Sequence, residues 1–118
     1  MEEHEARARA EKWIASWNSQ DVDEILSHYT DDFDMSSPFI ARVVEETSGT
    51  LRGKRAIGAY WKRGLERAPQ LRFELLDVLL GIDSLAIYYR STVTGKTVVE
   101  VLTVHGDKFS SGHAYYSI

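Results

Sequence analysis

The last third of the chain limits most strongly what it can fold into. Between residues 71 and 118, short apolar-rich runs are separated by turn sequences. This pattern predicts strands over residues 71–80, 85–93, 97–105 and 108–118. Connections as short as Thr94-Gly95-Lys96 and Gly106-Asp107 join neighbouring antiparallel strands. We therefore expect a meander, one face of which is covered by the earlier part of the chain.

The first part of the chain shows helical spacing instead. The apolar stripe of a first helix consists of Ala6, Ala10, Trp13, Ile14 and Trp17. Asp21, with Glu24 three residues later, is typical of the start of a second helix. A third helix is expected to begin at Lys54 and to end before Pro69. Helices first and a meander afterwards indicate an α+β fold.

The segment between the second and third helices is less regular. Alternation over residues 33–36 predicts a short strand. Ser37-Pro38 has the form of a helix cap followed by proline at the first helical position. We therefore expect one or two helical turns over residues 39–45 and a polar loop over residues 46–53.

Size and charge exclude several classes of protein. At 118 residues the chain has the length of one domain, which we assign to residues 1–118. A net charge of −4 and an isoelectric point near 5.5 argue against nucleic acid or an anionic membrane as a partner. No apolar run approaches the ~18 residues of a membrane span, and no signal peptide follows the acidic start Met1-Glu2-Glu3. The sequence thus predicts a cytoplasmic protein, and its lack of cysteine excludes disulfides and thiolate chemistry.

One carboxylate interrupts the third strand of the predicted meander. Glu100 lies among valines in the segment 98–104. A carboxylate on the covered face of a sheet needs a partner, a raised pKa or a ligand. If Glu100 and Leu102 face inward, Val99 and Val101 face outward and can form an apolar surface between two copies of the chain. Glu100 is therefore either a pocket group or a structural carboxylate satisfied by neighbouring strands.

Short motifs along the whole chain resemble the NTF2-like superfamily, and within it the SnoaL-like branch. These motifs are Trp17-Asn18-x-x-Asp21, Tyr29-x-Asp31-Asp32-Phe33, Gly53-x-x-Ala56-Ile57, Glu100-Val101-Leu102, Gly106-x-Lys108-Phe109 and Tyr115-Tyr116. The resemblance implies a cone in which three N-terminal helices pack on a strongly curved, mostly antiparallel sheet around a cavity. It also implies a homodimer through the outer face of the sheet, as in many members. Because members include ketosteroid isomerases, polyketide cyclases, epoxide hydrolases and non-catalytic domains, the fold alone does not fix an activity.

The catalytic residues of the known family enzymes are mostly not matched. The ketosteroid isomerases place their basic aspartate where this chain has Ser37, and their oxyanion-binding tyrosine where it has Trp13. Limonene-type epoxide hydrolases use an arginine at the position of Val98 and an aspartate at the position of Ala114, and the cyclases place their acid near the latter. Only Glu100 matches a family acid, so the resemblance leaves open whether the chain is an enzyme.

Three residues are candidates for proton transfer. Glu100 is the first, and His113 can pair with it across adjacent strands as an acid/base couple. The alternative partners of Glu100 are Arg90 and Tyr89, and the alternative for His113 is a hydrogen-bonded or exposed strand residue. Asp34, on the short first strand, lies either at the cavity mouth or in solvent.

Large side chains are expected to reach the cavity, although most of them also suit a core. The candidates for ligand contact are Trp17, Tyr29, Trp61, Tyr89, Tyr115 and the inward-facing Leu102. Arg42, Glu45 and Glu46, within residues 39–53, form either a lid or a solvated loop. We expect no cofactor and no metal, since no histidines or carboxylates show ligand spacing.

Two functions remain open from the sequence. The first is a pocket protein that binds a small apolar or aromatic molecule beside Glu100, with proton-transfer chemistry of an isomerase, cyclase or dehydratase type. The second is a non-catalytic homodimeric interaction module whose cavity is filled by its own side chains. An open apolar cavity with Glu100 at its wall favours the first.

Overall fold

The computed structural model describes residues 1–44 and 47–118. Its helices are α1 (Glu3–Ser19), α2 (Val22–Leu26), α3 (Pro38–Val43) and α4 (Lys54–Arg67). Its strands are β1 (Tyr29–Ser36), β2 (Thr50–Arg52), β3 (Phe73–Leu80), β4 (Ser84–Ser91), β5 (Thr97–His105) and β6 (Lys108–Tyr116). The predicted α+β class and the meander are confirmed. The helix predicted to begin at Lys54 is α4, and its start is confirmed as well.

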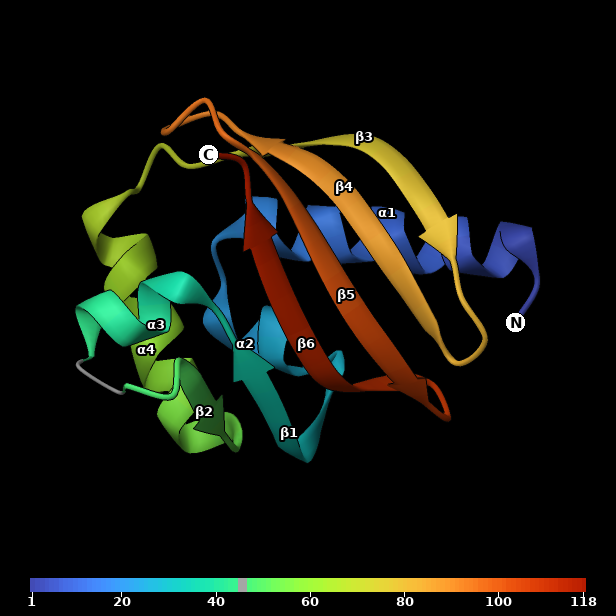
Figure 1. Ribbon diagram of the computed structural model, residues 1–118, viewed down its shortest axis with the longest axis horizontal. Helices are drawn as coiled ribbons and strands as arrows, with labels where there is room; N and C mark the ends of the chain where they lie inside the picture. The colour runs from blue at the N-terminus through green and yellow to red at the C-terminus, as the bar shows by residue number, and fades with distance from the viewer. Residues whose placement is uncertain (45–46) are drawn as a thin grey trace.

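The strands form one six-stranded sheet in the order β2-β1-β6-β5-β4-β3. The pairs within the meander are antiparallel, whereas β1 runs parallel to β6. Figure 1 shows the sheet curving across the front of the molecule, with α1 behind it and α3 and α4 beside the end of β6. Within residues 1–44 and 47–118, the helices therefore cover only the inner face of the sheet and leave its outer face open.

The segment before α4 differs from the sequence prediction in two places. Residues 50–52 were expected in a polar loop but form β2, which pairs with β1 at Met35 and Leu51. A three-residue strand is too short to show an alternating pattern, so only its partner reveals it. In addition, β1 begins at Tyr29 rather than at Phe33, because pairing with β6 outweighs the low strand propensity of Asp31 and Asp32.

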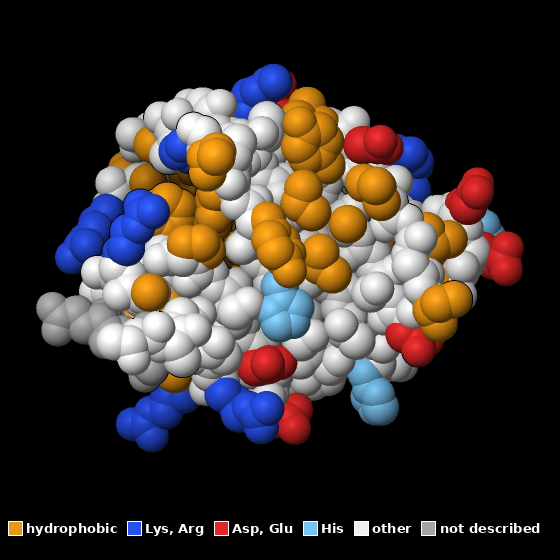
Figure 2. All heavy atoms as spheres, viewed as in Figure 1, with side chains coloured by type: hydrophobic (Ala, Val, Ile, Leu, Met, Phe, Trp, Pro, Cys, Tyr) orange, Lys and Arg blue, Asp and Glu red, His pale blue; other side chains and the backbone are white. Residues whose placement is uncertain are grey.

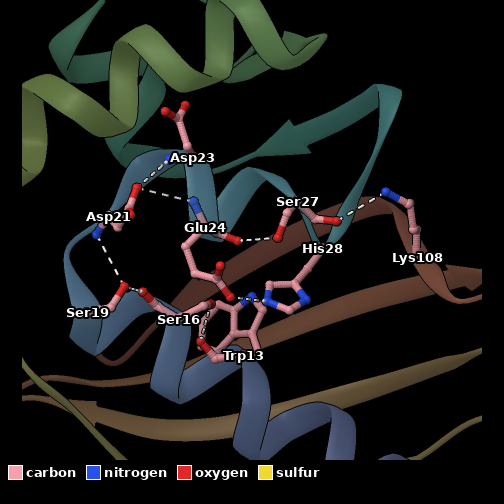
Figure 3. A network of polar contacts seen from close by, with 9 residues as sticks. All are labelled: Trp13, Ser16, Ser19, Asp21, Asp23, Glu24, Ser27, His28 and Lys108. Carbon is pink, nitrogen blue, oxygen red and sulfur yellow. Dashed lines mark hydrogen bonds and ion pairs between the residues drawn. The ribbon is translucent and has the colours of Figure 1, made fainter.

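The junction between α1 and α2 is fixed by side chains that satisfy the free backbone groups at the helix ends (Figure 3). The Asp21 carboxylate accepts hydrogen bonds from the backbone N–H groups of Asp23 and Glu24, which confirms the predicted cap. The Ser19 hydroxyl donates a hydrogen bond to the carbonyl of Ser16 in α1 and accepts one from the backbone N–H of Asp21. Further on, Lys108 at the start of β6 donates to the carbonyl of Ser27. These bonds set α2 against the sheet.

The core lies between the helices and the inner face of the sheet. Trp13, Tyr29 and Phe33 are fully buried there, and the Trp13 indole N–H donates a 2.8 Å hydrogen bond to the Tyr29 hydroxyl. Aromatic rings continue from this pair toward α4, where Tyr29 contacts Trp61 with ring centroids 5.3 Å apart. Aromatic packing thus fills one end of the inner layer and borders the cavity described below. Within the described residues, no helix is both long and apolar enough to cross a bilayer.

Candidate functional site

A cavity of about 330 Å³ lies between the inner face of the sheet and helices α1, α3 and α4. Its lining is mainly apolar, and its aromatic members are Trp17, Phe39, Tyr60, Trp61, Phe73, Tyr89 and Tyr116. Exposed residues form its mouth: Val43 of α3, Arg63 and Arg67 of α4, and Val93 and Thr94 after β4. The volume falls within the range of about 300–1,000 Å³ that is usual for small-molecule pockets.

Glu100 lies at the wall of this cavity with only 4% of its surface exposed. Strand alternation directs it inward, opposite Ile87 of β4 and Ala114 of β6. Its Oε1 atom accepts a 3.3 Å hydrogen bond from the Tyr89 hydroxyl. Its Oε2 atom is buried and has no hydrogen-bond partner among the described residues. Of the three structural partners expected from the sequence, only Tyr89 contacts it, so half of this carboxyl is left for another group.

Burial has a large effect on the charge of Glu100. Loss of water around the carboxyl raises its pKa to about 8, although the hydrogen bond from Tyr89 opposes this increase. At pH 7 the carboxyl is therefore mostly protonated, and a small rise in pH ionises it. In the acid form it can donate a hydrogen bond to a ligand, and in the ionised form it can accept a proton.

The same carboxyl affects the pKa of three tyrosines in the cavity wall. Burial, followed by the negative charge of Glu100, raises the pKa of Tyr60, Tyr89 and Tyr116 above the usual value. Their hydroxyls consequently stay protonated at neutral pH and remain available as hydrogen-bond donors. The buried indole N–H of Trp17 also lacks a hydrogen-bond partner among the described residues. The cavity thus combines an apolar wall with a few polar groups.

The residues expected to contact a ligand separate into two groups. Trp17, Trp61 and Tyr89 line the cavity. Tyr29 and Leu102, by contrast, are fully buried in the core and do not line it. The Tyr29 hydroxyl is already bonded to Trp13. Leu102 packs near Gly112, where an added Cβ would lie 3.1 Å from its Cδ2 atom.

Residues near the end of β6 occupy the opposite faces from those expected. Because Glu100 pairs with Ala114, the neighbouring His113 points to the outer face, where it pairs with Val101. The predicted Glu100–His113 couple is therefore absent, and His113 Nδ1 instead lies 2.6 Å from the Ser36 hydroxyl. Tyr115 is likewise on the outer face, 61% exposed, while Tyr116 lines the cavity in its place.

Asp34 does not line the cavity either. Its neighbour Met35 points into the cavity, so alternation places Asp34 on the other face of β1, beside Arg52 and Ser111. Asp34 and Glu100 are therefore on opposite faces of the sheet and do not form a pair of acids.

The positions that depart from the family enzymes also have clear local roles. Ser37 borders the cavity, and its hydroxyl accepts a hydrogen bond from the backbone N–H of Phe39, which caps α3 as predicted. Val98 lines the cavity with an apolar side chain, Ala114 is buried on the inner face, and Trp13 is a core residue. Besides Glu100, no Asp, Glu or His among the described residues lines the cavity.

The segment that was expected to form either a lid or a solvated loop contributes residues to the cavity wall. Phe39 and Val43 of α3 line the cavity, and the Arg42 guanidinium lies over the Phe39 ring, 5.2 Å from its centre. Glu45 and Glu46 lie outside the described residues, so the choice between a lid and a solvated loop over residues 39–53 stays open. No group of three or more His, Asp or Glu side chains within residues 1–44 and 47–118 could hold a metal ion.

Several lining residues were not identified from the sequence. Tyr60, Gly64 and Arg67 are spaced four and three residues apart on α4 and share the face toward the cavity. Their spacing was the available signal, but arginine and glycine do not stand out in an apolar pattern. Tyr116 could have been assigned from the register of β6, since it follows the inward-facing Ala114 by two residues.

Comparison with known proteins agrees with this architecture. Residues 10–114 match the family described as the SnoaL-like domain. The chain therefore belongs to the SnoaL-like family, which confirms the resemblance seen in the sequence. It is similar to a SnoaL-like protein of unknown function from Burkholderia thailandensis, with 42% identity and a TM-score of 0.95. That match covers 99% of this chain and 98% of the other.

More distant structures share the fold. A putative ketosteroid isomerase from Kribbella flavida has 17% identity and a TM-score of 0.75, with coverage of 98% of this chain and 79% of the other. A putative polyketide cyclase from Sinorhizobium meliloti has 12% identity and a TM-score of 0.75, with coverage of 92% and 94%. A comparison with curated proteins finds no match.

Proposed function

We propose that this SnoaL-like protein binds a small, partly apolar molecule in the cavity and that Glu100 is its main polar contact. The observation that carries this proposal is the unpartnered Oε2 atom of Glu100 at the wall of a cavity of about 330 Å³. A buried polar atom without a partner costs roughly 1–3 kcal/mol, which a ligand hydrogen bond would recover. An interaction module with a self-filled cavity, the other candidate, would have no comparable open volume.

We further propose that Glu100 exchanges a proton with the bound molecule. A pKa of about 8 supports this, because both protonation states are then populated near neutral pH. The tyrosine hydroxyl of Tyr89, bonded to Oε1, would orient the carboxyl during this exchange. Chemistry that needs one acid, such as an isomerisation or a dehydration, suits this arrangement better than chemistry that needs a pair of acids. We expect neither a cofactor nor a metal to take part, and this stays a prediction.

We also propose a homodimer through the outer face of the sheet. In Figure 2, which has the view of Figure 1, hydrophobic side chains gather over the middle of this face. Residues of β4 to β6 that alternation places there are Ala86, Tyr88, Val99, Val101 and Tyr115. A second copy of the chain would remove this apolar surface from water. The cytoplasmic location expected from the sequence stays a prediction.

Binding of 2-naphthol tests the pocket, since this neutral aromatic alcohol has a flat apolar body and one polar group. We expect it to change the fluorescence of Trp17 and Trp61, and Glu100→Leu to weaken binding several-fold through loss of the hydrogen bond. Gly64→Phe should block the mouth, whereas Gly64→Ala should not, because a Cβ at Gly64 has no neighbour within 4 Å. Equal binding to the protein and to Gly64→Phe, or no binding to either, would contradict the proposal.

A further inference from the structure

The charges around the cavity are distributed unevenly. Arg63 and Arg67 lie one helical turn apart on α4, are exposed, and both line the cavity. Neither forms an ion pair with another described residue. In Figure 2, basic side chains lie beside a hydrophobic hollow at the left of the view, where Figure 1 shows α4. The mouth therefore carries two positive charges, and neither is paired with an acidic side chain among the described residues.

The inner end of the cavity has the opposite character. Glu100 is the acidic group among the described lining residues, and no lysine or arginine is bonded to it. An anion placed beside this buried carboxyl would lose its hydration without gaining a cation. An anionic group of a ligand would therefore lie at the mouth, and an uncharged oxygen would lie at Glu100.

Between these two ends the wall is aromatic. Trp17 and Trp61 contact each other edge to face, with ring centroids 4.9 Å apart, and Tyr60 and Phe73 add further aromatic surface to the lining. Such a wall matches a flat apolar body, since aromatic pairs gain from stacked and edge-on contacts beyond the burial of area.

On this basis, and resting on the proposed function, we propose that the ligand is a small aromatic carboxylate with a hydroxyl or carbonyl group at its far end. Its carboxylate binds Arg63 and Arg67 at the mouth. Its ring lies against the aromatic wall, and its far oxygen contacts Glu100. A guanidinium presents planar, paired donors that fit a carboxylate, so α4 provides the selectivity for an acid over a neutral relative.

The test compares 6-hydroxy-2-naphthoate with 6-hydroxy-2-naphthamide by fluorescence titration at pH 7 and low salt. The two probes share a body and a far hydroxyl and differ in one charge. We expect the protein to prefer the carboxylate by about five- to tenfold, the amount that two solvent-exposed ion pairs supply. The preference should fall as salt is added, because exposed charges are screened.

A matched pair of variants separates the effect of the two arginines at the mouth from the effect of the net charge of α4. In Arg63→Gln/Arg67→Gln the preference should disappear, because binding of the carboxylate weakens toward that of the amide. Arg55→Gln/Lys62→Gln removes the same net charge from α4 at residues that do not line the cavity, and it should keep the preference. Circular dichroism melting curves confirm that both variants are folded.

The outcomes distinguish this inference from the proposed function. Equal binding of the two probes to the unaltered protein would overturn the inference while leaving the pocket intact. A preference that survives Arg63→Gln/Arg67→Gln, or that is lost equally in the control variant, would overturn it as well. Failure of both probes together with binding of 2-naphthol again contradicts only the inference. Failure of all three probes contradicts the proposed function itself.

Discussion

Tyr89 and Glu100 are joined across the β4–β5 pair by a 3.3 Å hydrogen bond, although they are diagonal rather than direct neighbours in the sheet. The direct partners are Val98 for Tyr89 and Ile87 for Glu100. The bond occupies Oε1 and leaves Oε2 buried and without a partner among the described residues. Glu100 is thus anchored on one side only, and this arrangement leads to the first two predictions.

Replacing Glu100 with glutamine should change stability little. The amide keeps an oxygen that can accept from Tyr89, and at pH 5 it replaces a group that is neutral in the folded protein and close to its solvated pKa of 4.5 in the unfolded chain. We expect a change in the free energy of unfolding within about 1 kcal/mol at this pH, as for one altered hydrogen bond. Urea denaturation at pH 5 measures it. A loss of several kcal/mol would instead identify Glu100 as half of an ionised structural pair.

The stability contributed by Glu100 should fall as the pH rises. Its pKa is about 8 in the folded protein and near 4.5 when solvated, so between these values the folded state binds more protons than the unfolded state. Stability therefore decreases with pH in this window, by at most about 1.4 kcal/mol per unit, and is constant below and above it. The measurement is the unfolding free energy of the protein minus that of Glu100→Gln at pH 5, 6, 7 and 8, which should fall as the pH rises. A value that stays constant or rises with pH would contradict the raised pKa.

Two glycines of α4 should respond differently to alanine. A Cβ at Gly64 meets nothing within 4 Å, so Gly64→Ala should stabilise the protein by roughly 0.5–1 kcal/mol through the better helix propensity. At Gly58 a Cβ would lie 3.0 Å from Cδ1 of Leu26, so the gain there should be smaller or reversed. Thermal melts of the two variants measure this contrast. Equal gains would show that α2 adjusts freely to the added methyl.

A charge placed on the outer face of the sheet should prevent formation of the proposed dimer. Val101 lies on that face opposite His113, and Val101→Lys would place an ammonium within the proposed dimer surface. We expect sedimentation velocity to show a dimer for the protein and a monomer for the variant, with similar circular dichroism spectra. Ala15→Lys, on the exposed side of α1, is the control and should stay dimeric. A protein that is monomeric without any substitution would remove the basis for this surface.

Most helices and strands of this fold could be predicted because the sequence signals that mark their ends are local. Glycine turns mark the ends of β5, and the Asp21 and Ser37 caps mark the helix starts, each within a few residues. Strand β2, by contrast, is recognisable only through its partner strand, where Leu51 lies opposite Met35. Alternation within a single strand also showed that Glu100 and Leu102 share one face, and the structure shows that this face is the inner one.

The site was harder to predict because it depends on register between strands. A shift of one residue separates the expected His113 and Tyr115 from the observed inward positions, Ala114 and Tyr116. The cavity itself is the space that packing leaves unfilled, which no single segment encodes. This is also why Tyr29 proved to be a core residue and Arg67 a residue of the cavity mouth.

The cap of α3 has a consequence for how easily this scaffold could change its chemistry. Ser37 is held at the cavity border by its bond to the backbone N–H of Phe39, a task that an aspartate performs equally well at the start of a helix. The single substitution Ser37→Asp can therefore place a second carboxylate at the pocket while keeping the cap of α3. Gaining or losing an acid at this site requires no rebuilding of the surrounding backbone.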